Sequence, residues 1–240
     1  MGPIRPAIFA CFLTLSLASP VLAETAQHPT SEHLVDLSEN HWCYGCVVKV
    51  VDKYDVLSGF QDHTFRGDWT VNRYELAAAV ARAYSQIKLS HKLVLPSPAD
   101  GKVRAIGVLP EHWAYHYVRK LAEENGLLDE LFEAGSFHGD RVLTRKELAY
   151  AMSEFLSQME KAMGRQLKVE RRESQLAVDH DHSSVFQPHI ELALNRYQFM
   201  NLHQDHTFRP NDPVTRYGLA AALCRVFELF EADQGQVANQ

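Results

Sequence analysis

One cassette occurs three times in this chain of 240 residues, and it constrains the fold more than any other feature. The hexapeptide Gln-Asp-His-Thr-Phe-Arg occupies residues 61–66 and again residues 204–209. In each copy an arginine follows the phenylalanine by eight positions, and a decayed middle copy keeps this spacing. The three arginines are Arg73, Arg145 and Arg216. Self-similarity at a period of about 71 residues indicates three copies of one supersecondary unit that cannot bury its apolar face alone.

Each copy predicts a helix, a loop and a second helix. The second helices align without gaps, and their apolar residues recur at the spacing of one helical face. The predicted fold is therefore all-α, with three helix–loop–helix repeats around a pseudo-threefold, three-pronged bundle. The repeats span residues 36–87, 107–159 and 179–230. The connector at 88–106 holds prolines and glycine and should be a loop, whereas the connector at 160–178 lacks proline and should extend a helix outward.

The starts of the second helices carry capping signals. Thr144 and Glu147 have the spacing of a capping box, and Asn72 and Glu75 have the same spacing. The third helix keeps a threonine cap, but Gly218 replaces the reciprocal glutamate. We therefore expect the third helix start to be looser than the other two.

The first 23 residues predict a secretory signal, with Arg5, an apolar run and a small-residue cleavage site. No later run approaches the ~20 apolar residues of a membrane span, so no span is expected after cleavage. Loss of Arg5 changes the net charge from −6 to −7. That acidic balance argues against a broad phosphate-binding surface and hence against a nucleic-acid partner. An anionic ligand would need local cations.

The three arginines directly follow helix caps, where the helix dipole already disfavours a cation. Their repetition at one register suggests an anion site made of free backbone N–H groups and a guanidinium. The alternative is that each arginine pairs with an acid on a neighbouring repeat and only holds the repeats together. Both roles can coexist.

These motifs resemble S-layer homology (SLH) domains. The matching residues are the His-Trp pairs at 41–42 and 112–113, the Asp-x-Thr-Phe-Arg loops and the tetrapeptides at 72–75, 144–147 and 215–218. The stretch 55–84 is similar in style to the SLH segment of cyanobacterial outer-membrane porins. The resemblance implies a three-pronged pseudo-trimer that binds an anionic, often pyruvylated, peptidoglycan-linked polysaccharide in grooves between repeats. The tetrapeptide arginines would face those grooves.

The copies depart from the family pattern in several places. His63 and His206 stand where the family usually has glycine, and the middle copy has lost the Asp-x-Thr of the loop. We therefore expect Arg73 and Arg216 to contribute more to ligand binding than Arg145.

The remaining candidate ligand-binding residues are two acids and two aromatics: Asp62, Asp205, Trp42 and Trp113. The acids would order the loop or accept sugar hydroxyls. The tryptophans would offer flat apolar faces to a sugar ring, and ordinary packing is the alternative.

Cys43 and Cys46 form a Trp-Cys-x-x-Cys motif at a predicted helix start. A thioredoxin-like site would need a βαβ frame, which the sequence does not predict. A local disulfide and inert thiols remain the other readings. The Asp-His-Asp-His run at 179–182 could hold a transition metal, but a solvated loop is the preferred interpretation, and no metal or cofactor is predicted.

The leading functional hypothesis is a non-catalytic, secreted envelope protein of the periplasm or cell wall that binds a wall polysaccharide. One alternative is an SLH-fold adaptor that binds an envelope protein and no glycan; its sign would be buried, ion-paired arginines. Another is a periplasmic thiol oxidoreductase, whose sign would be an exposed Cys43 with a lowered pKa. No set of residues for another enzyme stands out.

Overall fold

The computed structural model of the chain describes residues 30–93, 106–124, 126–170 and 173–237. The predicted signal segment lies outside them. Within these residues the secondary structure is helical and only isolated β-bridges occur, which confirms the all-α prediction. The long helices are α2 (Arg73–Ser90), α4 (Arg145–Met163) and α6 (Arg216–Val237). The short helices are α1 (Tyr44–Val48), α3 (Tyr115–Arg119) and α5 (Gln187–Glu191), each continued by a π turn, Lys49–Lys53, Lys120–Glu124 and Leu192–Arg196.

The long helices begin where the capping residues predicted. Asn72 Oδ1 accepts from the Glu75 backbone N–H, and the Glu75 carboxylate accepts from the Asn72 N–H, both at 2.9 Å. In α4 the Glu147 carboxylate accepts from the Thr144 N–H. At the start of α6 the Gly218 N–H donates to Thr215 Oγ1. The reciprocal hydrogen bond to the Thr215 N–H is missing, because Gly218 has no side chain that could accept it.

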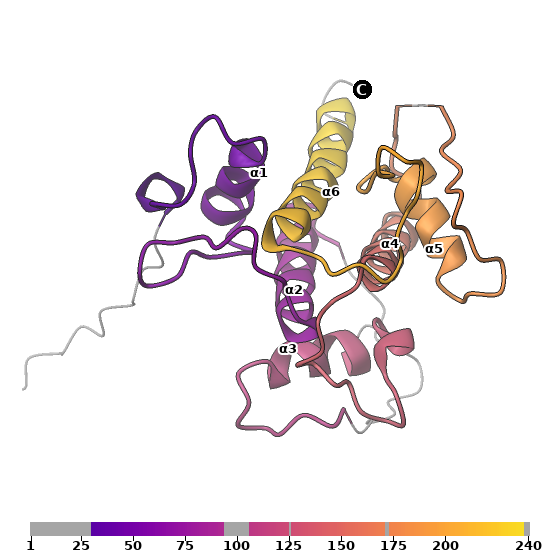
Figure 1. Cartoon of the computed structure of the whole chain (residues 1–240), viewed down its shortest axis with the longest axis horizontal. Coiled ribbons are helices and arrows are strands. Elements are labelled where there is room, and N and C mark those ends of the chain that lie inside the picture. Colours follow the sequence, from indigo (N-terminus) through magenta and orange to yellow (C-terminus); the bar gives the residue numbers. More distant parts are fainter. Residues whose placement is uncertain (1–29, 94–105, 125, 171–172, 238–240) are drawn as a thin grey trace, which may run out of the picture.

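The short helix of each repeat packs on the long helix of another repeat. Helix α3 packs on α2, α5 packs on α4, and α1 packs on α6, while α2 also contacts both α4 and α6 (Figure 1). Each of these helix pairs thus joins the long helix of one repeat to the short helix of the next, with the last repeat joined to the first. This exchange explains physically why a single repeat would leave both of its helices without their apolar partners.

Three backbone hydrogen bonds join the repeats in a cycle just before the long helices. The Val71 N–H donates to the Val214 carbonyl at 3.0 Å, Val214 donates to Leu143 at 2.9 Å, and Leu143 donates back to Val71 at 2.9 Å. No single repeat can satisfy these amides by itself. The cycle therefore sets the positions from which Arg73, Arg145 and Arg216 enter the interfaces between repeats.

The loop phenylalanines are buried as predicted, and so is Phe155 in the stripe of α4. The three loop positions are Phe65, Phe137 and Phe208. The predicted outward extension at 160–178 is wrong. Helix α4 ends at Met163 because Gly164 takes a left-handed conformation (φ 66°) as its C-cap.

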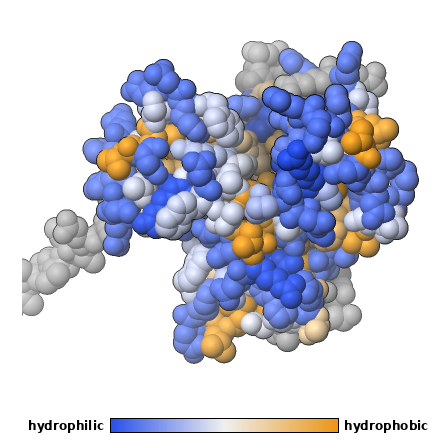
Figure 2. Space-filling model, in the orientation of Figure 1, coloured by the Kyte–Doolittle hydropathy of each residue, from blue (hydrophilic) through white to orange (hydrophobic). Residues whose placement is uncertain are grey.

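The surface that Figure 2 shows carries small apolar patches separated by hydrophilic residues. Among the described residues, none of the helices is both long and apolar enough to serve as a membrane span.

Candidate functional site

The first amides of the long helices bond to loop carbonyls of the next repeat. Arg73 N–H donates to Arg141 O at 3.1 Å and Tyr74 N–H donates to Gly139 O at 3.0 Å. The same pairs of amides at 145–146 and 216–217 donate to loop carbonyls in the third and first repeats. These amides are not available to a ligand, so that part of the predicted anion site is wrong.

Arg73 is buried in the interface between the first and second repeats. Its Nη2 lies 2.6 Å from Glu147 Oε1 and 3.3 Å from Glu133 Oε1, and its Nη1 donates to the Leu131 and Phe137 carbonyls. Glu147 is itself buried and also closes the α4 cap. One carboxylate therefore serves the cap of its own helix and the arginine of the preceding repeat.

Arg216 is held in the same way between the third and first repeats. Its Nη1 lies 3.4 Å from Glu75 Oε1, while Nε and Nη2 donate to the Phe65 and Ser58 carbonyls. The ring of Phe60 covers the guanidinium at 4.8 Å. Burial lowers the pKa of Arg216, and the Glu75 carboxylate opposes that shift.

Arg145 differs from both because the partner acid is missing. By alignment, Gly218 stands where Glu75 and Glu147 stand in the other copies. Arg145 Nε donates to Phe208 O at 2.7 Å and Nη2 to Asn201 O at 2.8 Å. Among the described residues no carboxylate oxygen lies within 4.0 Å of its guanidinium nitrogens. Burial lowers the pKa of Arg145, and the charges of Asp212 and Asp179, which make no ion pair with it, oppose that shift.

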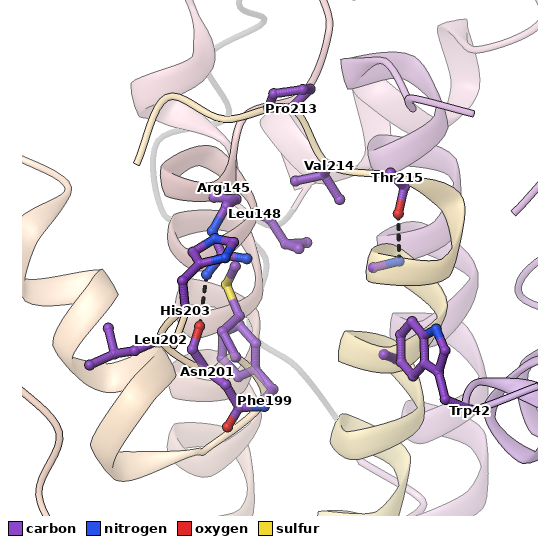
Figure 3. Close-up of a pocket in the computed structure, with 13 residues that line it drawn as sticks. Trp42, Arg145, Leu148, Phe199, Asn201, Leu202, His203, Pro213, Val214 and Thr215 are labelled. Atoms are coloured by element: carbon purple, nitrogen blue, oxygen red, sulfur yellow. Dashed lines mark hydrogen bonds between the residues drawn. The ribbon is translucent and has the colours of Figure 1, made fainter. Parts of the chain in front are cut away.

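Arg145 lines a cavity of about 330 Å³, called here the Arg145 pocket. The start of α4, the loop at 199–203 and the first turns of α6 form its walls, and Trp42 of the first repeat stands across from the arginine (Figure 3). His203 lies beside Arg145 in Figure 3, and its Nε2 is buried without a hydrogen-bond partner. At the equivalent position the closed Arg216 interface has Phe60.

The tyrosines that follow Arg73 and Arg216 pack on the histidine of the His-Trp pair of the next repeat. The Tyr217 ring stacks on His41 at 4.2 Å, and the Tyr74 ring lies 4.3 Å from His112. Trp42 and Trp113 meet these tyrosines edge-on, with ring centroids 6.1 Å apart, and remain 70% and 55% exposed. Trp42 lines the same cavity as Arg145.

Asp62 and Asp205 order their loops through the same contacts. Asp62 accepts from both the backbone and the hydroxyl of Thr64 and from Arg66 at 2.7 Å, and these bonds lower the pKa of Asp62 to about 2. Asp205 makes the same set with Thr207 and Arg209, so its pKa is also lowered. The loop-ordering role is thereby observed, while neither carboxylate lines the Arg145 pocket.

Sequence reasoning missed two further loop acids. Asp36 accepts from the Phe65 and Arg66 amides at 2.6 and 2.7 Å, and Asp179 accepts from the Phe208 and Arg209 amides at 2.7 and 2.8 Å. The shared separation of 29 residues between each acid and its phenylalanine was the available signal.

Asp179 begins the run that we considered as a metal site. Its carboxylate is committed to the loop amides, while His180 and His182 face each other with their Nε2 atoms 2.9 Å apart. No cluster of three or more possible metal ligands was found in the part of the chain that the structure describes.

Cys43, Cys46 and Cys224 are free thiols in the structure, which corresponds to the inert-thiol alternative and not to the local Cys43–Cys46 disulfide. Cys43 is fully buried, and a hydrogen bond to Cys46 together with burial raises its pKa. These are the opposite of the signs expected for a thioredoxin-like Cys43.

Comparison with known proteins gives a limited similarity. The chain is 32% identical over 76 residues to the outer membrane protein SlpA of Deinococcus radiodurans. The matched region is 32% of this chain and 6% of that protein. No family model matches the chain.

Proposed function

We propose that this protein is a non-catalytic cell-envelope protein that binds an anionic, peptidoglycan-linked polysaccharide through the Arg145 pocket. The carrying observation is that Arg145 is partly desolvated and has no close carboxylate partner, in contrast to Arg73 and Arg216. A ligand carboxylate would supply the charge that Gly218 cannot. The similarity to an outer membrane protein supports a place in the envelope.

The other pocket residues suit a sugar acid. His203 Nε2 is buried without a partner and would bond a hydroxyl or carboxylate oxygen. Trp42 offers an exposed aromatic face across the pocket, against which a sugar ring would stack. In its finer form the proposal follows the SLH resemblance: three repeats stand around a pseudo-threefold axis, and the polymer is pyruvylated.

The structure changes which arginine we propose as the ligand residue. The loop motif favoured Arg73 and Arg216, but both are buried and ion-paired across repeats. We assign them to holding the repeats together and assign ligand binding to Arg145. A charge-assisted, partly buried contact is worth about 1.5–3 kcal/mol, or roughly ten- to a hundredfold in affinity.

The test is co-sedimentation with purified peptidoglycan sacculi using Gly218→Glu. A Cβ at Gly218 meets only ordinary contacts at 3.5 Å, so the position tolerates a side chain. The new carboxylate should pair with Arg145 and weaken binding by about tenfold or more. Gly218→Gln is the matched control, because it adds the same volume without charge. Sacculi stripped of their attached polymers should bind neither variant nor wild type.

The adaptor alternative keeps one specific observation in its favour, namely the buried and ion-paired state of Arg73 and Arg216. An adaptor would bind stripped and intact sacculi equally and would be indifferent to the charge at position 218. If Gly218→Glu binds intact sacculi as tightly as wild type does, the assignment of the Arg145 pocket is wrong.

A further inference from the structure

Three cysteines from two distant parts of the chain meet where α1 packs on α6. Cys43 is the N-cap residue of α1, Cys46 lies in its first turn, and Cys224 lies in α6, 178 positions after Cys46. Cys43 and Cys224 are buried in the core, whereas Cys46 is only partly buried. The thiols of Cys43 and Cys224 both lie within hydrogen-bond reach of the Cys46 sulfur. Cys46 is therefore the middle and the most accessible member of the group.

We propose that Cys46 forms a disulfide with Cys224 under oxidising conditions, which covalently joins the first repeat to the last. This inference rests on the contact between α1 and α6 and is independent of glycan binding. The bond would covalently join α1 to α6, the two packed helices that come from opposite ends of the chain. It differs from the Cys43–Cys46 link that the Cys-x-x-Cys spacing suggested.

The surroundings of the thiols distinguish the two possible partners. Cys224 Sγ lies 3.6 Å from Glu228 Oε1; the charge of this carboxylate raises the pKa of Cys224, but the carboxylate is also a base that can take the proton that the thiol must lose. Cys43 Sγ lies 3.6 Å from the Tyr217 backbone carbonyl, which cannot act as a base. Cys224 is thus the better second nucleophile.

Cys46 has the properties of the first nucleophile. Hydrogen bonds from Cys224 and Cys43, together with the charge of Lys49, lower the pKa of Cys46. Lys49 is itself held by Glu228 and Glu231 at 3.3 and 3.2 Å. The hydrogen bond to Cys46 is also the main cause that raises the pKa of Cys224, so that effect ends once Cys46 has reacted.

The oxidant is a small-molecule or protein disulfide, RSSR. The Cys46 thiolate attacks one sulfur, forms a mixed disulfide and releases RS⁻. Cys224 gives its proton to Glu228 and attacks Cys46 Sγ, which forms the protein disulfide and releases the second RS⁻. Two protein thiols are oxidised, RSSR is reduced to two RSH, and the two thiol protons end on the released RS groups.

The test treats purified protein with oxidised glutathione, alkylates the remaining thiols and maps the disulfides by mass spectrometry. We expect a Cys46–Cys224 linkage, an alkylated Cys43 and a melting temperature roughly 5–10 °C above that of the dithiothreitol-reduced protein. Cys43→Ser should form the same linkage. Glu228→Gln should slow its formation about tenfold at neutral pH without changing its identity.

Wild-type mapping decides the inference even if a variant fails to fold. A Cys43–Cys46 linkage would contradict it. A stable glutathione adduct on Cys46, or complete alkylation of all three thiols after oxidation, would contradict it as well.

Discussion

Two interfaces between repeats are closed around their arginine, and one is open. In the closed interfaces Arg73 and Arg216 meet Glu147 and Glu75, and a tyrosine packs on a histidine of the next repeat. In the open interface the glutamate is replaced by Gly218 and the tyrosine by lysine. The same backbone frame therefore carries two kinds of site. A repeat can lose its ion pair and still fold, because the other two interfaces hold the cycle of repeats together.

The largest expected difference concerns stability. Arg73→Ala should lower the free energy of unfolding by about 3–5 kcal/mol, because it leaves the buried Glu147 carboxylate unpaired. Arg145→Ala leaves no such charge behind and should cost about 1–2 kcal/mol for its two carbonyl bonds. Urea unfolding of both variants measures this difference. Equal losses would remove the distinction between closed and open interfaces.

The next effect concerns the packing that only the closed interfaces have. A Cβ at Gly67 would lie 2.0 Å from the buried Tyr217 ring, so Gly67→Ala should destabilise the protein by about 1–3 kcal/mol. Gly45→Ala is the control, since nothing lies within 4 Å of its Cβ position. Thermal unfolding of the two variants gives the comparison. A Gly67→Ala protein as stable as the control would show that the tyrosine stack is loose.

A reciprocal exchange tests whether the glutamate makes the difference. Gly218→Glu should raise the free energy of unfolding by about 1–2 kcal/mol, because it removes a helical glycine and completes the cap and the ion pair. Glu75→Gly should lower it by a similar amount or more for the same reasons. Chemical denaturation checks both. A destabilising Gly218→Glu would mean that Arg145 cannot reach the new carboxylate.

The smallest effect should be shared by both kinds of interface. The pKa of Asp62 is lowered to about 2 in the folded protein, below its ordinary 3.8. Its contribution to stability is therefore complete above about pH 4 and is lost as the pH falls towards 2. Asp62→Asn and Asp205→Asn should each flatten the acid branch of the stability profile, measured by denaturant midpoints between pH 5 and pH 2. A flattening in only one variant would show that the two loops are not equivalent.

The repeated sequence was enough to predict the all-α fold, the starts of the long helices and the buried loop phenylalanines. These features depend on short-range patterns: apolar periodicity, capping residues such as Asn72 and Thr144, and turn residues. His63 and His206 both have left-handed conformations, with φ near 60°, at the same position of two identical hexapeptides.

Tertiary structure decided the site. The sequence offered three equivalent arginines, and it could not say that the glutamate beside each one pairs with the arginine of a different repeat. That pairing depends on how the chain closes, which places residues about 70 positions apart within hydrogen-bond distance. For the same reason the sequence predicted only a looser helix start from Gly218. The larger consequence of Gly218 is that Arg145 has no close carboxylate partner in a pocket that Trp42 faces. This pocket exists only after the third repeat has docked against the second and the first.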